Sequence, residues 1–218
     1  MQLRDLQNKH AGEAVWVTGS GPSLDRVGAG EITGPRIYLN RTAFSLPWSA
    51  GETYWLVIDD AWGQGTPGPW TDTLEAVKSG ALGGVGVFRD PLLPPRDDGS
   101  CFTQGGANIV NWTTPPSKQL PRDQVLQLDA ATLAARGWLY ARAGTAAPAI
   151  HLAWLMGASR VILAGVDGTD GYAGHVRHWY RQTRRGGFGY GQAREDALNA
   201  AAALGMPIED RSALELSP

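Results

Sequence analysis

Short apolar runs that end in small or polar residues recur along this 218-residue chain, and several are separated by stretches long enough for a helix. Such runs are typical of buried strands. The expected strands cover 14–17, 36–39, 54–58, 84–88, 160–164 and 206–209. The expected helices cover 24–27, 71–79, 145–157 and 195–204. This alternation predicts an α/β fold with a Rossmann-like, mostly parallel open sheet and helices on both of its faces.

Composition limits what else the chain can be. Hydrophobic residues make up 43% and charged residues 18%, as in globular proteins, and the length fits one domain over 1–218. The single cysteine, Cys101, excludes a disulfide framework. Neither a run of about 18 apolar residues nor a secretory h-region is present, so we expect a cytoplasmic protein without a membrane span. The sequence leaves the oligomeric state open.

A glycine turn follows the first expected strand and is the first candidate site. Gly19, Ser20, Gly21 and Ser23 lie between that strand and a short helix. Glycines allow close approach to the backbone, and free N–H groups at a helix start favour an anion. The turn lacks the GK[ST] ending of a Walker A loop and the GxGxxG spacing of dinucleotide folds. It is therefore either a structural turn or a phosphate-binding turn of another kind.

Polar residues also mark other strand ends and the start of the Ala-rich helix. Asn40 ends the second expected strand. Thr145 opens the helix over 145–157, where it is expected either as the N-cap or as part of a second anion site. His151, within that helix, is expected as a core histidine. Because ligands of such sheets bind at the carboxyl ends of strands, these positions are candidates for binding.

Two pairs of carboxylates follow expected strands. Asp59 and Asp60 end the strand over 54–58, and Asp167 and Asp170 follow the strand over 160–164. If the two strands are neighbours, Asp59 and Asp167 are expected to hold Mg²⁺ through water and phosphate oxygens. The alternative is that these carboxylates cap backbone amides.

Two further segments are expected to lie over the site. Residues 89–122 are rich in Pro, Gly, Asn and Asp, which predicts a long loop. Residues 171–191 are rich in glycine, arginine and aromatic residues, which predicts a mobile lid. Within the lid, Arg177 and Arg181 are expected to bind phosphate groups, and His175 and His178 are candidate general bases.

The basic residues are concentrated near this lid. Residues 171–194 hold five arginines (177, 181, 184, 185 and 194) and no acidic residue. The 14 other basic residues are outnumbered by 21 acidic ones. The balance predicts a local anion site rather than adhesion of the whole protein to polyanions.

Four segments occur in a recognisable order: VTGSGPSLD, YLNRTAF, AGTAAPAIHLAWLMGASRVILAGVD and the lid-like stretch. Together they resemble the small bacterial sialyltransferase superfamily and its relatives, which include archaeal-type hydroxymethyldihydropterin pyrophosphokinases. The resemblance covers most of the chain loosely, with close agreement over 15–27, 37–44 and 144–167.

The resemblance implies a nucleotide bound at the glycine turn. By position, Gly19, Ser20, Gly21 and Ser23 would contact the nucleotide, Asn40 would lie nearby and Thr145 near the phosphate. Tyr172 or Tyr180 would stabilise the leaving phosphate. Two positions depart from the sialyltransferase pattern. Asp59 replaces a strand-end Asn, and no histidine stands near 189–190, so His175 or His178 would have to act as the base.

These features predict a transferase that uses a nucleotide-activated donor, most simply a glycosyltransferase acting on an acceptor hydroxyl. The basic, aromatic lid also fits a modified base in nucleic acid as acceptor. One alternative is an ATP-dependent pyrophosphokinase in which Asp59 and Asp167 hold Mg²⁺. Another is a nucleotide-binding module without catalysis.

Overall fold

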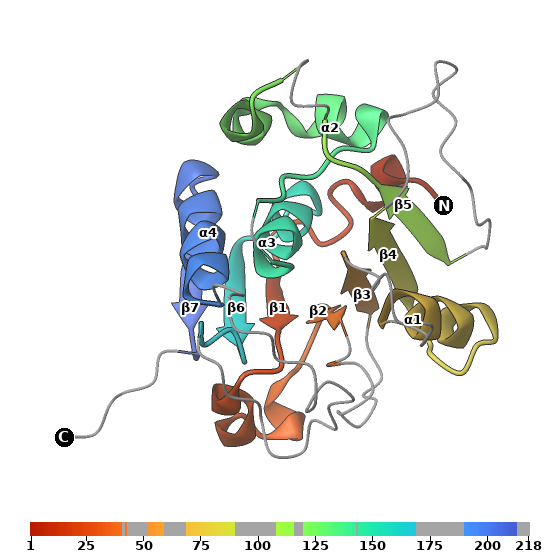
Figure 1. Ribbon diagram of the computed structural model, residues 1–218, viewed down its shortest axis with the longest axis vertical. Coiled ribbons are helices and arrows are strands. Elements are labelled where there is room, and N and C mark those ends of the chain that lie inside the picture. Colours follow the sequence, from red (N-terminus) through yellow and green to blue (C-terminus); the bar gives the residue numbers. More distant parts are fainter. Residues whose placement is uncertain are drawn as a thin grey trace.

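The computed structural model describes residues 1–40, 42, 52–58, 69–89, 108–115, 120–142, 144–168 and 190–212. Within them, seven strands form one parallel sheet in the order β5-β4-β3-β2-β1-β6-β7 (Figure 1). The strands are β1 (Ala14–Thr18), β2 (Arg36–Leu39), β3 (Thr53–Val57), β4 (Val85–Arg89), β5 (Ile109–Trp112), β6 (Arg160–Ala164) and β7 (Ile208–Asp210). The predicted α/β fold with an open parallel sheet is confirmed.

Helices lie on both faces of the sheet. The α-helices are α1 (Pro69–Lys78), α2 (Ala130–Arg136), α3 (Ala146–Leu155) and α4 (Tyr190–Ala203). The 3₁₀ turns are η1 (Leu3–Leu6), η2 (Pro22–Arg26), η3 (Ala29–Glu31) and η5 (Arg122–Gln127). The helices α3 and α4 pack side by side on one face, whereas α1, η2 and η3 lie on the other (Figure 1). In the described part of the chain, no helix is both long and apolar enough to cross a membrane.

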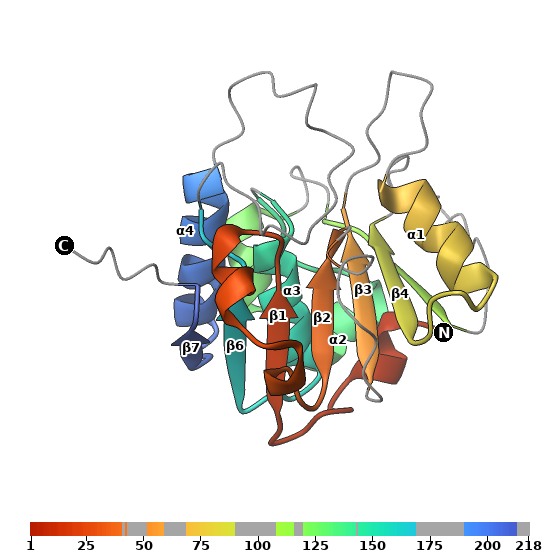
Figure 2. The ribbon, with the colours of Figure 1, turned by 90° about the horizontal axis from the view of Figure 1, so that it is seen from below.

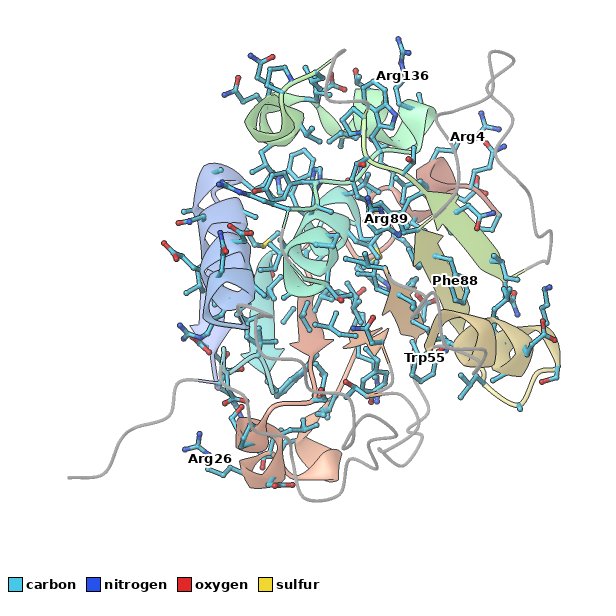
Figure 3. All side chains as sticks on the ribbon, in the orientation of Figure 1. Arg4, Arg26, Trp55, Phe88, Arg89 and Arg136 are labelled. Carbon is cyan, nitrogen blue, oxygen red and sulfur yellow. The ribbon has the colours of Figure 1, made fainter. Side chains whose placement is uncertain are left out.

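The period-2 alternation of each strand explains how both faces are covered. In β1, Val15 and Val17 belong to the core beneath α3 and α4, whereas Trp16 faces the side of η2 and η3. In β3 and β4, Trp55 and Phe88 pack in the cluster beneath α1 (Figure 3). Because both faces are buried, the strands read as nearly continuous apolar runs.

The strand order determines where a ligand is expected. From β1 the sheet grows through β2 to β5 on one side, and the chain then returns to add β6 on the other side of β1. All strands point the same way, so their carboxyl ends gather at one edge (Figure 2). The order reverses between β1 and β6, which is the position where open parallel sheets bind ligands.

The N-terminal segment caps the end of α3 that lies farthest from this edge. The N–H groups of Asn8, His10 and Gly12 donate to the carbonyls of 155, 156 and 157 at distances of 2.8–3.0 Å. The last carbonyls of a helix accept no hydrogen bond from an N–H group of the same helix, so the N-terminal segment supplies the missing donors. The other end of α3, its N-terminus, lies at the carboxyl edge of the sheet.

The structure corrects the expected loop over 89–122. Within it, Ile109–Trp112 forms β5, which pairs with β4 and buries Val110 and Trp112 completely. The run of four residues is too short for periodicity to separate it from its Gly- and Pro-rich surroundings. The helix α2 was also not expected, although Asp129 caps its first turn by accepting from the Thr132 N–H at 2.9 Å.

The last expected helix is longer than the sequence suggested. It begins at Tyr190 rather than at residue 195. The final two residues of the expected lid therefore belong to α4. The remainder of the expected lid, residues 171–189, lies outside the described residues.

Candidate functional site at the carboxyl edge of the sheet

The turns that follow β1 and β6 are tied together by backbone hydrogen bonds. The N–H groups of Gly19 and Gly21 donate to the carbonyls of Ala164 and Gly165, both at 2.8 Å. In the other direction, the Gly165 N–H donates to Ser23 Oγ at 3.0 Å. These bonds continue the pairing of β1 with β6 beyond the last residue of β1.

Two of the predicted nucleotide-binding glycines serve this close approach. A Cβ atom on Gly19 would overlap the Gly165 carbonyl, and one on Gly21 would overlap the Asp167 carboxylate. Gly21 has an ordinary φ of −71°, so its backbone conformation does not require glycine. The missing side chains therefore make room for the neighbouring turn.

Asp167 places its carboxylate on the backbone of the glycine turn. Both of its oxygens lie 3.2 Å from the Ser23 nitrogen and accept from that N–H group. Because Pro22 has no N–H, Ser23 supplies the first N–H of η2, which is where the sequence predicts an anion. The protein's own carboxylate occupies this donor, and the Ser23 hydroxyl is buried against the Gly165 N–H.

Asn40 and Thr145 meet on the other side of β1. Asn40 follows β2 with a left-handed φ of 50°, and its Nδ2 donates to Thr145 Oγ1 at 3.0 Å. Thr145 occupies the N-cap position of α3, as predicted, but its hydroxyl caps no backbone N–H. The bond therefore joins the end of a strand to the start of a ten-residue helix.

The N-terminus of α3 presents a favourable place for an anion. The first N–H groups of a helix have no acceptor within it, and the helix dipole makes this end positive. Pro148 removes one of these donors, whereas Ala146 and Ala147 keep theirs in a buried position. Together with Thr145 Oγ1, they can provide donors to a phosphate group.

A second network, of hydrogen bonds and an ion pair, joins the β6 turn to the segment after β7 and to α4. The sequence does not predict it. The Val166 N–H donates to Ser212 Oγ at 2.8 Å, and the Ser212 N–H donates to Asp210 Oδ1 at 2.8 Å. Asp210 also pairs with Arg194 of α4. Arg194, counted above with the acid-free basic segment, is therefore neutralised within the fold.

His151 lies in the core beneath the loop that leads to Thr145. It is fully buried, and its Nδ1 accepts from the Tyr140 N–H at 2.8 Å. That bond assigns the proton of the neutral ring to Nε2. Burial lowers the pKa of His151 to about 3, so the ring is neutral at physiological pH.

The strands before the two predicted metal ligands are not neighbours, as that prediction assumed, and because Asp59 lies outside the described residues the metal role of the pair stays a prediction. Between β3, which precedes Asp59, and β6, which precedes Asp167, lie β2 and β1. Three strand spacings of about 4.8 Å separate their ends by about 14 Å. Among the described residues, no group of three His, Cys, Asp or Glu side chains could hold a metal ion. The Asp167 carboxylate is directed at the Ser23 N–H and not at another described carboxylate.

The described residues bring together Gly19, Ser20, Gly21, Ser23, Asn40, Thr145 and Asp167 at the carboxyl edge. Ser20, in the turn after β1, is half-buried. The other predicted site residues, Asp59, Tyr172, His175, Arg177, His178 and Arg181, lie outside the described residues, and their roles remain predictions.

No protein-family model matches the chain, and no curated protein matches its sequence. The fold and the site together define an open parallel α/β domain with a polar site where its central strands end.

Proposed function

We propose that this protein is a transferase that binds a nucleotide-activated donor at the carboxyl edge of β1 and β2. The observation that carries the proposal is the bond between Asn40 and Thr145 at the start of α3. It places a polar pair beside the first N–H groups of α3, which the Thr145 hydroxyl does not cap, at the carboxyl edge of an open parallel sheet. This combination favours a ligand with a phosphate or diphosphate group.

The contacts of the site suggest which residues would bind the phosphate of the donor and which would contact its nucleoside. Gly21 and Ser23 are committed to the β6 turn, so they support the site rather than face the ligand. Thr145 and the N–H groups that follow it are the better phosphate donors. Ser20, which is half-buried and on the rim of the glycine turn, is suited to contact the nucleoside part.

The reaction follows from residue types in the lid sequence. In glycosyl transfer, His175 or His178 would take the proton of an acceptor hydroxyl, and the hydroxyl oxygen would form a bond to the anomeric carbon. The bond from that carbon to the donor phosphate would break, and Tyr172, Arg177 and Arg181 would stabilise the departing phosphate. Diphosphate transfer is less well supported, because the Asp167 carboxylate accepts from Ser23 and has no described carboxylate partner.

A panel of ligands in thermal unfolding tests the binding proposal. Nucleoside mono- and diphosphates, sugar nucleotides and inorganic pyrophosphate are compared, each with and without EDTA. A ligand at 100 times its Kd adds about 2.7 kcal/mol, which should raise Tm by roughly 5–10 °C in a domain of this size. A shift that survives EDTA supports a metal-independent transferase. If no phosphate-bearing ligand shifts Tm, the proposal is wrong.

The polar pair at α3 is expected to contribute to the affinity for that ligand. Thr145→Val removes the hydroxyl but keeps the shape, and Asn40→Gly removes the amide while tolerating the left-handed φ. Each change should weaken binding about tenfold, the effect of one hydrogen bond to a charged group. Isothermal titration with the best ligand of the panel measures this.

Ser159→Ala is the matched control, because it removes an exposed hydroxyl at the opposite end of α3. If both site variants bind as tightly as Ser159→Ala, the phosphate lies elsewhere.

A further inference from the structure

We propose that Asp167 is a positioning residue, whose carboxylate fixes the glycine turn through the Ser23 N–H, and that it does not act as a metal ligand. In this arrangement Asp167 takes the place that a bound anion would hold at the start of η2. The binding part of the inference rests on the proposed function, whereas the structural part does not.

The first support is the direction of the carboxylate. Both oxygens of Asp167 lie 3.2 Å from one backbone nitrogen, that of Ser23. An ionised carboxylate that accepts from a backbone N–H forms a charge-assisted bond, which is stronger than a neutral one. The carboxylate is therefore directed at the β1 turn and not toward the end of another acidic strand.

The second support is the space reserved for the carboxylate. A Cβ atom at residue 21 would overlap an oxygen of Asp167, although the backbone of Gly21 is in a conformation that any residue adopts. The Cβ would also lie 2.9 Å from the Gly165 carbonyl oxygen, so the position is reserved for glycine by the carboxylate of Asp167 together with the backbone of the β6 turn. Two segments about 145 residues apart are thus matched in shape as well as in hydrogen bonding.

The third support is the rigidity of the segment that carries Asp167. Its neighbour Val166 is held by Ser212 Oγ, and Ser212 is held by Asp210, which pairs with Arg194. The adjoining Gly165 is bonded to Ser23 from the other side. A backbone segment held at these two positions can fix the place of the carboxylate that follows it, and through that carboxylate the place of the glycine turn.

Comparison of two substitutions distinguishes positioning from metal binding. Asp167→Asn keeps a carbonyl oxygen that can accept from Ser23 but loses the charge, whereas Asp167→Ala loses both. A positioning role tolerates Asn and not Ala. A metal ligand tolerates neither, because the amide is a much poorer ligand for Mg²⁺ than a carboxylate.

Amide hydrogen exchange of peptides spanning residues 19–24 gives the readout that needs no ligand. We expect exchange about tenfold faster in Asp167→Ala and in Gly21→Ala than in wild type, with Asp167→Asn close to wild type. Asp5→Ala is the matched control, because Asp5 accepts from the Gln2 N–H at the opposite edge of the sheet. Equal exchange in Asp167→Ala and wild type would overturn the inference.

Titration with ADP, with and without Mg²⁺, provides the second readout. We expect Asp167→Asn to bind ADP within about twofold of wild type in both conditions, and Asp167→Ala to bind at least tenfold more weakly. A loss of Mg²⁺-dependent binding in Asp167→Asn as large as in Asp167→Ala would overturn the inference in favour of a metal ligand. If wild type does not bind ADP, that result counts against the proposed function alone, and the exchange experiment still decides the role of Asp167.

Discussion

Lowering the pH from 7 to 5 is expected to destabilise the folded protein by about 2 kcal/mol through His151 alone. The pKa of this buried histidine is about 3 in the folded protein and near 6.5 in the unfolded chain. Below pH 6.5 the unfolded chain binds a proton that the folded protein does not. The stability is therefore fully present above pH 6.5 and is lost as the pH falls toward 3. The 1.5 pH units between 6.5 and 5 correspond to about 2 kcal/mol.

Urea unfolding of wild type and His151→Gln at pH 7 and pH 5 measures this effect. The glutamine carbonyl can still accept from the Tyr140 N–H, but it does not titrate. We expect wild type to lose about 2 kcal/mol more than the variant between the two pH values. The wild type and the variant differ only at residue 151, so the difference between their pH dependences reports on His151. An identical pH dependence of the two proteins would contradict the burial of a neutral His151.

His151 is also linked to the start of α3 through the loop that leads to this helix. It accepts from Tyr140, which lies five residues before Thr145 in the loop that leads to the helix. Acid destabilisation at His151 therefore bears on the same loop that positions Thr145 against Asn40.

Local patterns predicted the elements but not their neighbours. The strands β2 and β6 were expected at their observed bounds, since each is a short apolar run followed by Gly or Asn. The order of the strands was not predictable, because an apolar run carries no information about which strand lies beside it. For that reason Asp59 and Asp167 were expected together, although two strands lie between β3 and β6.

The glycine turn illustrates the same limit within the site. Its place between a strand and a helix start was correctly expected from local signals alone. Its partner is the β6 turn, about 145 residues away, and only the folded chain shows that the close approach is between two turns. Likewise, Arg194 belongs to a stretch of the sequence without acidic residues, whereas its partner Asp210 follows α4 at the end of β7.

This arrangement changes where an anion is expected to bind. The start of η2 has an internal carboxylate, so its N–H is not available, whereas the start of α3 has a threonine whose hydroxyl does not cap it. A ten-residue helix also has a stronger dipole at its end than a single 3₁₀ turn. The phosphate is therefore expected at α3, with the glycine turn acting as the wall of the site.

Gly19→Ala is expected to be the most damaging single-atom change at this wall, with a loss of about 3 kcal/mol in unfolding free energy. The added Cβ would overlap the backbone carbonyl oxygen of Gly165, which cannot move without breaking the bond that it accepts from the Gly21 N–H. Overpacking against a side chain usually costs about 1–3 kcal/mol, and a backbone obstacle at two central strands belongs at the upper end.

Thermal and urea unfolding measure the loss, which corresponds to a fall in Tm of roughly 6–12 °C for a domain of this length. Gly30→Ala is the matched control, because a Cβ on Gly30 would enter open space and its φ is not left-handed. We expect Gly30→Ala to unfold like wild type. Equal stability of the two variants would show that the turns after β1 and β6 separate readily, and the carboxyl edge would then not be the preorganised site that a phosphate-bearing ligand requires.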